Sequence, residues 1–397
     1  MKINKWTLGL AAVGLVTLPA GLQAEEQMQS VATSLSSTTI SGYVNTGAQW
    51  DIGTGNGNPP GYSFNSNGKQ DGFSLNVVKI SIERPLDEAE WAAGYKVDLL
   101  FGEDANVLGA QSVLSDGATD LGIQQAYVAL RAPTGNGLDF KVGVFDTIIG
   151  YEVFDAGGNP NYSRSWGYTI EPTTHTGVLA SYQVNDYIAA SAGIANTYGP
   201  TINDRPFGTT SGNDKAESYK TYMGSVALTA PEDWGFLSGS TLYAGVVNGF
   251  GSGAQENVTS IYVGTAMATP IKGLVAGTAH DWQLLHDTPP GGGGKHAYAH
   301  GLYLSFQATE KLSLHGRVEY AKFSAASVGT LYPGVNEKVL GLTGTVQYDL
   351  WQNVLSRLEI RWDHQMSGSG DAFGGDIGDA PSDKDHVTVA GNIIYQF

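Results

Sequence analysis

Four histidines gather around a run of glycines, and imidazole side chains are able to bind a metal. His280 and His286 precede the run GGGG (291–294), and His296 and His300 follow it. Imidazoles brought together across a hairpin can hold zinc or copper. In an extended strand, however, period two puts these histidines on apolar faces beside Trp282, Leu284 and Tyr298. We therefore favour a surface role over a metal site.

A second group, of carboxylates, suggests calcium chemistry. The glycine-rich stretch 367–385 contains Asp371, Asp376, Asp379, Asp383 and Asp385. Clustered carboxylates can bind Ca²⁺, but the spacing of an EF-hand loop is missing. A solvated loop, which divalent ions could bridge to phosphate groups, is the favoured interpretation, so we predict no dedicated metal site.

Signatures of catalysis are missing. The sequence contains neither GxSxG nor HExxH, its glycine runs lack the Lys-Ser of a phosphate-binding loop, and it has no cysteine. We predict no enzyme, no catalytic residue and no cofactor. The absence of cysteine also means that disulfides do not hold the fold.

Opposed charges stand in one long irregular segment, residues 147–171. They are Glu152, Asp155, Arg164 and Glu171. Loops longer than about 12–15 residues are usually functional or disordered, and five aromatic residues between positions 151 and 168 argue against disorder. Charged side chains of both signs at the constriction of a pore select among the solutes that pass. We predict that this loop folds inward and constricts a pore; the alternative is a loop packed on the rim or on a neighbouring subunit.

The rest of the chain is a rhythm of alternating polar and apolar residues, which predicts strands. Sixteen segments are expected, at 38–51, 72–83, 90–102, 121–132, 137–146, 172–184, 186–197, 217–230, 237–249, 256–269, 272–286, 295–308, 310–323, 336–350, 353–366 and 384–397. Each is long enough for the 9–11 or so residues with which a tilted strand crosses a membrane. Strands of a soluble sandwich are usually nearer 5–6 residues.

The connections and the last strand support the same architecture. Short turns such as PTGN (133–136) alternate with long loops such as 52–71 and 103–120. This alternation is typical of bacterial outer-membrane barrels, with short periplasmic turns and long outer loops. The chain ends HVTVAGNIIYQF, with alternating apolar residues and a terminal Phe397. We therefore predict an all-β transmembrane antiparallel β-barrel of about 16 strands.

One face of each strand should line the lumen of such a barrel. The charged residues expected on this inner wall are Lys96, Asp98, Arg131, Lys141, Arg317, Glu319, Arg357, Glu359, Arg361 and Asp363. Six are basic and five acidic if Asp139 is included, so the wall is nearly neutral while the loops are acidic. A hydrophilic path is one interpretation and internal ion pairing the other; both can hold together.

The first residues differ from the rest. A basic start, a short apolar run and Ala24 predict a signal peptide over 1–24. A short polar leader is expected over 25–37 and the barrel over 38–397. Removing Lys2 and Lys5 leaves 19 basic and 38 acidic residues, which argues against nucleic-acid binding. Glycine is frequent, at 54 of 397 residues, and charged residues make up only 15%; both suit a wall one residue thick.

Several motifs resemble the β-barrel porin-2 family of outer-membrane proteins. They are QQAYV (124–128), KVG (141–143), IGYE (149–152), NPNYSRS (159–165) and THTGV (174–178), with LNVVKISIERP and VDLLFGEDA earlier in the chain. They cover about 100 residues; beyond these, only the barrel rhythm matches. The resemblance implies an outer-membrane porin without catalytic residues.

These observations predict a water-filled channel in the cell outer membrane for passive diffusion of small hydrophilic solutes or ions, with a weak cation preference from the acidic loops. Expected partners are outer-membrane lipid and lipopolysaccharide, the barrel-assembly machinery through the strand ending in Phe397, and two further copies in a homotrimer. The alternatives are a closed structural or adhesion barrel and, less favoured, a barrel enzyme.

Overall fold

The chain folds into one closed barrel of sixteen antiparallel strands. The computed structural model describes residues 38–53, 55–112, 119–206, 217–251, 257–286, 295–324, 337–368 and 370–397. The signal peptide and leader predicted over 1–37, and the GGGG run, lie outside the described residues. Each strand pairs with its neighbours in sequence, and β1 pairs with β16, as in Tyr43 opposite Gln396. Closure leaves no unpaired sheet edge.

The strands match the predicted segments closely. They are β1 (Thr39–Asp51), β2 (Gly72–Arg84), β3 (Ala93–Phe101), β4 (Leu121–Ala132), β5 (Leu138–Asp146), β6 (Thr174–Asn185), β7 (Ile188–Ala195), β8 (Thr221–Thr229), β9 (Thr241–Phe250), β10 (Asn257–Ala268), β11 (Leu274–His286), β12 (Lys295–Gln307), β13 (Leu312–Phe323), β14 (Glu337–Trp351), β15 (Val354–Ser367) and β16 (Asp385–Gln396). All sixteen predictions are confirmed, with ends displaced by at most a few residues.

Two short α-helices were not predicted. They are α2 (Glu103–Leu108), after β3, and α3 (Trp166–Ile170), before β6. Three 3-10 turns, η1 (Asn67–Lys69), η2 (Ala156–Gly158) and η3 (Glu232–Leu237), complete the helical segments described. The Ser165 hydroxyl accepts a hydrogen bond from the Tyr168 amide and so caps the start of α3. None of the described helices is long and apolar enough to span a membrane.

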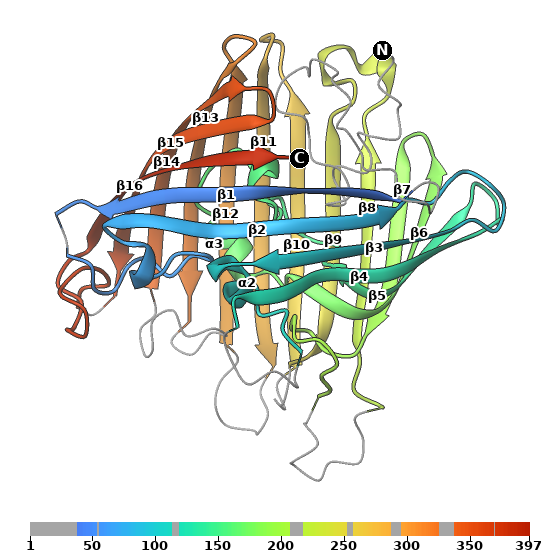
Figure 1. Ribbon diagram of the computed structural model, residues 1–397, viewed down its shortest axis with the longest axis horizontal. Helices are drawn as coiled ribbons and strands as arrows, with labels where there is room; N and C mark the ends of the chain where they lie inside the picture. The colour runs from blue at the N-terminus through green and yellow to red at the C-terminus, as the bar shows by residue number, and fades with distance from the viewer. Residues whose placement is uncertain are drawn as a thin grey trace.

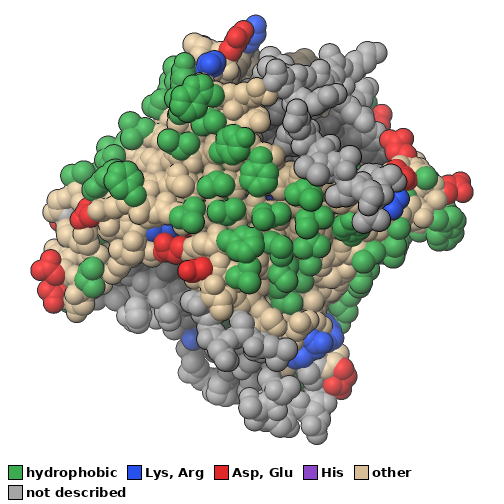
Figure 2. Space-filling model, in the orientation of Figure 1, with side chains coloured by type: hydrophobic (Ala, Val, Ile, Leu, Met, Phe, Trp, Pro, Cys, Tyr) green, Lys and Arg blue, Asp and Glu red, His purple; other side chains and the backbone are tan. Residues whose placement is uncertain are grey.

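The strands present an apolar face outward and a polar face inward, which is what lipid outside and water inside require. In β15, Leu358 and Ile360 are 61% and 57% exposed, whereas Arg357, Glu359 and Arg361 between and beside them are at most 5% exposed. Figure 2 shows hydrophobic side chains spread over the face that β1 to β4 form. In Figure 1 these strands cross in front of β9 to β13 at a steep angle, and the helices lie within the barrel.

Chain connections fill much of the interior. Three buried apolar clusters join them to the wall: one around Ile148, Ile149 and β8 to β11, one around Trp166 and β12 to β14, and one around α2, Phe154 and β16. Apolar burial of this kind fixes the position of inward-folded segments.

The tight turns between strands lie at the end of the barrel opposite the long connections. The turn between β14 and β15, for example, uses Asn353 at φ 60°, which asparagine tolerates better than most residues.

Candidate functional site

The segment 147–171 leaves the wall between β5 and β6 and crosses the interior to β13 and β15. Its backbone amides reach carboxylates there. The amides of Tyr162 and Ser163 donate to Glu359 at 2.7 and 3.0 Å, and the amide of Trp166 donates to Glu319 at 2.7 Å. These contacts join positions 153 to 197 residues apart in sequence. We call this segment the crossing loop.

Three wall arginines hold the crossing loop from the same side. The Arg317 guanidinium donates to the Ser163 carbonyl at 2.8 Å and pairs with Glu152 at 2.9 Å. Arg361 donates to the Arg164 carbonyl at 2.6 Å. Arg357 donates to the carbonyls of Ala156 and Asn159. Hydrogen bonds from charged donors are roughly twice as strong as neutral ones, so this side fixes the loop firmly.

Wall carboxylates complete the network. Arg317 pairs with Glu319 at 2.6 Å and Arg361 with Asp363 at 2.7 Å, while Asp363 also accepts the Trp166 indole N–H at 2.8 Å. All of these groups are buried. Buried charges persist only when they are paired and hydrogen-bonded. Six of the predicted wall residues, Arg317, Glu319, Arg357, Glu359, Arg361 and Asp363, therefore act together as anchors for the crossing loop.

The other predicted wall residues lie apart from the crossing loop or at its edge. Arg131 pairs with Asp139 at 2.6 Å near the turns, and the Lys141 ammonium lies 4.8 Å from the centre of the Tyr127 ring. Lys96 lies 3.5 Å from Glu83 and 3.8 Å from Asp98. The structure thus separates the ten wall residues into three kinds. Six are buried and anchor the crossing loop, and Lys96, Arg131 and Lys141 are partly open. Asp98 is buried within the wall, where it pairs with Lys79 at 3.0 Å.

The four residues predicted for a constriction occupy different surroundings. Glu152 and Arg164 are 6% and 5% exposed; Arg164 donates to the Phe154 carbonyl and stacks near Phe64 and Tyr168. The Asp155 side chain is 35% exposed and pairs with Lys79 at 2.7 Å. Glu171 contacts a second carboxylate, Asp281 of β11. Their assignment to a constriction stays a prediction.

Glu171 and Asp281 form a buried acidic contact. Burial raises the pKa of Glu171 well above its ordinary value, and the negative charge of Asp281 beside it raises that pKa further. Burial and the neighbouring Asp281 charge therefore both favour the protonated form of Glu171. This contact closes the end of the crossing loop onto β11.

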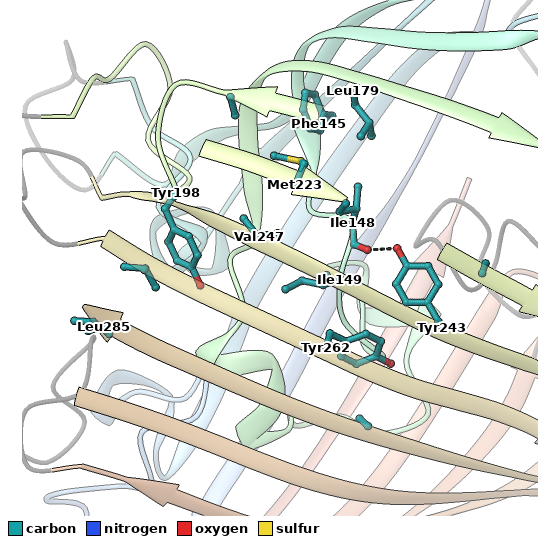
Figure 3. Close-up of a cluster of buried hydrophobic side chains, with 14 of the residues drawn as sticks. Phe145, Ile148, Ile149, Leu179, Tyr198, Met223, Tyr243, Val247, Tyr262 and Leu285 are labelled. Atoms are coloured by element: carbon teal, nitrogen blue, oxygen red, sulfur yellow. Dashed lines mark hydrogen bonds between the residues drawn. The ribbon is translucent and has the colours of Figure 1, made fainter. Parts of the chain in front are cut away.

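The first arm of the crossing loop is held by apolar contacts instead. Ile148 and Ile149 pack against residues of β8 to β10, and the Tyr243 hydroxyl donates to the Ile148 carbonyl (Figure 3). Tyr151 stacks on Tyr303 with ring centres 4.1 Å apart. Aromatic stacking and apolar burial, not charge, therefore position this arm.

Glycines in the wall make room for this arm. A Cβ at Gly277 would lie 2.2 Å from the Tyr151 hydroxyl oxygen, and one at Gly245 would lie 2.7 Å from Ile149 Cγ2. Both distances are below van der Waals contact, so larger residues would push the loop away. Part of the high glycine content therefore serves close approach of backbone and loop.

A small hollow, partly open to solvent, lies beside the crossing loop. The side chains that matter for its chemistry are Leu108 of α2, Asp146, Tyr151, Glu152, Phe154, Tyr168 and Glu171. The acidic residues of this lining are Asp146, Glu152 and Glu171; it contains no basic residue.

Sequence reasoning missed Lys79, Asp146 and Asp281. Lys79 pairs with both Asp98 at 3.0 Å and Asp155 at 2.7 Å. It alternates with Ser81 and Glu83 in KISIE, so period two alone could have placed it on the inner wall. Asp281 alternates with Ala279 and Gln283 in the same way. Asp146 ends β5, where no periodicity indicates direction.

The histidines lie on the outer face. His280 and His300 are directly opposite on β11 and β12, with their Nδ1 atoms 3.1 Å apart, beside Trp282 and Tyr298. Within the described ranges, no group of three or more His, Cys, Asp or Glu is arranged to hold a metal ion. Aromatic and histidine side chains in such a band suit the boundary of a membrane.

Comparison with known families agrees with this geometry. The family model described as "Putative beta-barrel porin-2, OmpL-like" matches residues 37–397. This chain is a member of that family. It is therefore a porin of the bacterial outer membrane, with the barrel of a passive diffusion channel, and the resemblance noted in its motifs is confirmed.

Solved porin structures share the fold. An anion-selective porin from Comamonas acidovorans is 12% identical, with 91% of this chain and 99% of that chain covered and a TM-score of 0.59. The outer-membrane channel DcaP of Acinetobacter baumannii is 12% identical over 91% and 97%, with a TM-score of 0.58. OmpT of Vibrio cholerae in its trimer form is 12% identical over 91% and 99%, with a TM-score of 0.56. No curated protein matches this chain.

Proposed function

We propose that this porin conducts small hydrophilic solutes and ions down their gradients without any catalytic step, and that the crossing loop sets the width of the path. The observation that supports this is the course of the loop from β5 to the carboxylates of Glu319 and Glu359 on the far wall. A segment fixed at both arms keeps one position and leaves a path of defined width beside it. Preorganised polar groups then set the size and charge preference.

The path runs between the crossing loop and the wall of β3 to β6. The loop covers the arc from β9 through β15 to β1 and β2, because its contacts run from Tyr243 through Arg317 and Arg357 to Lys79. On the opposite arc, Lys96 and Lys141 are only partly covered. In this arrangement Asp155 and Glu171 face the constriction, while Glu152 and Arg164 brace the loop from within.

Conductance is the direct test. Purified, refolded protein in a planar bilayer should give stepwise ion currents. Replacing residues 150–168 by a short Gly-Ser linker should raise the step size by about twofold or more, because it removes the constricting segment. Glu359→Gln, a milder change that weakens two loop contacts, should leave the barrel intact and increase current fluctuations.

The closed-barrel alternative has a specific observation in its favour, because three apolar clusters fill much of the interior. It predicts no steps from the wild type and steps only after the linker replacement. Steps of equal size in both proteins would instead contradict the constricting role of the loop.

Assembly and surroundings belong to the same proposal. The Vibrio cholerae relative is described as a trimer, and we infer a homotrimer for this chain, to be checked by native mass. Phe397 stacks on Tyr395 at the end of β16 and pairs with Gly42 of β1, and these contacts support the proposed role of the last strand as a signal for the barrel-assembly machinery. Lys322 and Tyr298, 5.8 Å apart on the outer face, suit contact with lipopolysaccharide phosphates.

A further inference from the structure

The hollow beside the crossing loop has an unbalanced charge. Its charged lining is acidic throughout: Asp146 at the end of β5, and Glu152 and Glu171 at the two ends of the loop. The partly open lysines of the wall, Lys96 and Lys141, are not part of this lining. A cleft lined by one sign of charge, with walls of low dielectric constant, concentrates ions of the opposite sign.

Glu152 does not contribute to this imbalance, because Arg317 neutralises it. Their atoms are 2.9 Å apart, and both side chains are at most 1% exposed. The Tyr303 hydroxyl and the Ser165 amide also donate to the Glu152 carboxylate. Glu152 is therefore part of the network that anchors the crossing loop.

Asp146 has no such partner. Its carboxylate accepts hydrogen bonds from the Gln124 amide at 3.1 and 3.3 Å, and no ion pair to it is found within the described residues. Lys79, whose charge acts on Asp146, is already paired with Asp98 and Asp155. Within the described residues, Asp146 is therefore a carboxylate without an ion-pair partner at the edge of the hollow.

The contact between Glu171 and Asp281 adds to the acidic character of the hollow. Gly150 packs directly against Glu171: a Cβ there would lie 2.3 Å from a carboxylate oxygen, and its φ of 118° also favours glycine. Asp281 is 3% exposed, and its Oδ1 has no hydrogen-bond partner within the described part of the chain. The contact therefore brings two acidic groups together next to the hollow, and one of their oxygens has no hydrogen-bond partner in the described part of the chain.

Aromatic rings complete the lining. Tyr151, Phe154 and Tyr168 border the same hollow. The faces of aromatic rings attract cations, including organic ammonium groups, and repel anions. Carboxylates and ring faces together thus match a positively charged solute with an apolar part.

We propose that this hollow is the selectivity site of the channel and that it passes small cations, both inorganic monovalent ions and protonated amines, in preference to anions, with Asp146 as the determining residue. This proposal rests on the proposed function, since it requires that the path run beside the crossing loop. It differs from general attraction by acidic outer loops, because it places the preference at one residue.

The test compares Asp146→Asn with Asp139→Asn. Both remove one carboxylate charge from β5, but Asp139 lies near the turns and pairs with Arg131. Reversal potentials in a KCl gradient should give a K⁺ to Cl⁻ permeability ratio above one for the wild type. Asp146→Asn should lower this ratio by about two- to threefold, and Asp139→Asn should leave it unchanged. Tetramethylammonium, a probe without hydrogen-bond donors, should permeate the wild type better than Asp146→Asn.

The outcomes separate this proposal from the proposed function. No current from the wild type refutes the channel itself. A current that responds to the loop replacement, combined with a wild-type preference for Cl⁻ or with equal ratios for wild type and Asp146→Asn, leaves the channel standing and overturns the selectivity site. Equal shifts in both variants also overturn it, because they indicate a general effect of net charge. Heat-modifiable migration on gels checks that each variant folds.

Discussion

Two arcs of the barrel wall hold the crossing loop by different means. The arc of β13 to β15 uses buried arginines and carboxylates, with Arg317 and Arg361 at most 1% exposed. The arc of β8 to β12 uses small and apolar residues such as Val247, with glycines where the loop comes closest. The charged arc fixes the polar backbone of the loop, and the apolar arc fixes its isoleucines. A charged residue on the inner wall therefore need not contact solute, because it can hold the crossing loop instead.

The largest effect should come from breaking the charged arc. Arg317→Ala leaves Glu152 and Glu319 buried without their partner and should destabilise the barrel by about 3–5 kcal/mol. Arg131→Ala removes a pair whose arginine side chain is 23% exposed, so the expected loss is below about 1 kcal/mol. Unfolding in denaturant, followed by tryptophan fluorescence, measures both. Equal losses would mean that the anchoring network adds no stability of its own.

The apolar arc should give the next largest effect. Ile148→Ala removes a side chain that is 2% exposed and should destabilise the barrel by about 2–4 kcal/mol through the cavity it leaves. Ile271→Ala, at a turn where the side chain is 58% exposed, should change stability by less than about 0.5 kcal/mol. The comparison fails if Ile148→Ala behaves like its control, because the first arm would then be held by its neighbours alone.

The strands could be predicted because lipid and water on the two faces of a wall impose period two on every segment. The position of the crossing loop could not. Its decisive bonds, such as that from Tyr162 to Glu359, join residues 197 positions apart, and no local pattern records such a pairing. The types of the wall charges were visible, but the sequence could not tell an arginine bonded to loop carbonyls from one facing water. The helix α3 was hidden for the same reason, since five residues in a glycine-rich loop become helical through their contacts with the wall.

A smaller effect on stability should appear when the pH is changed. It should come from Glu171, where the crossing loop returns to the wall. Because the pKa of Glu171 is raised by burial and by Asp281, its protonated form is favoured in the folded state. Stability should therefore fall as the pH rises from the ordinary value of 4.5 toward the raised pKa, where ionisation places two charges together beside Glu152. Glu171→Gln should flatten this dependence in unfolding measured across pH. An unchanged slope in the variant would assign the pH dependence to other groups.

The smallest effect should follow Arg164→Ala, which tests whether the buried positive charge of the crossing loop acts on solute. The Arg164 guanidinium is buried between Phe64 and Tyr168 and bonded to the Phe154 carbonyl. A charge screened from the path by aromatic rings and fixed to the loop backbone should influence permeating ions less than Asp146 does. We expect the K⁺ to Cl⁻ permeability ratio of Arg164→Ala to stay closer to the wild-type value than that of Asp146→Asn. A larger shift for Arg164→Ala would show that this buried charge of the loop does act on the path, and the distinction between anchoring and selecting charges would then have to be abandoned.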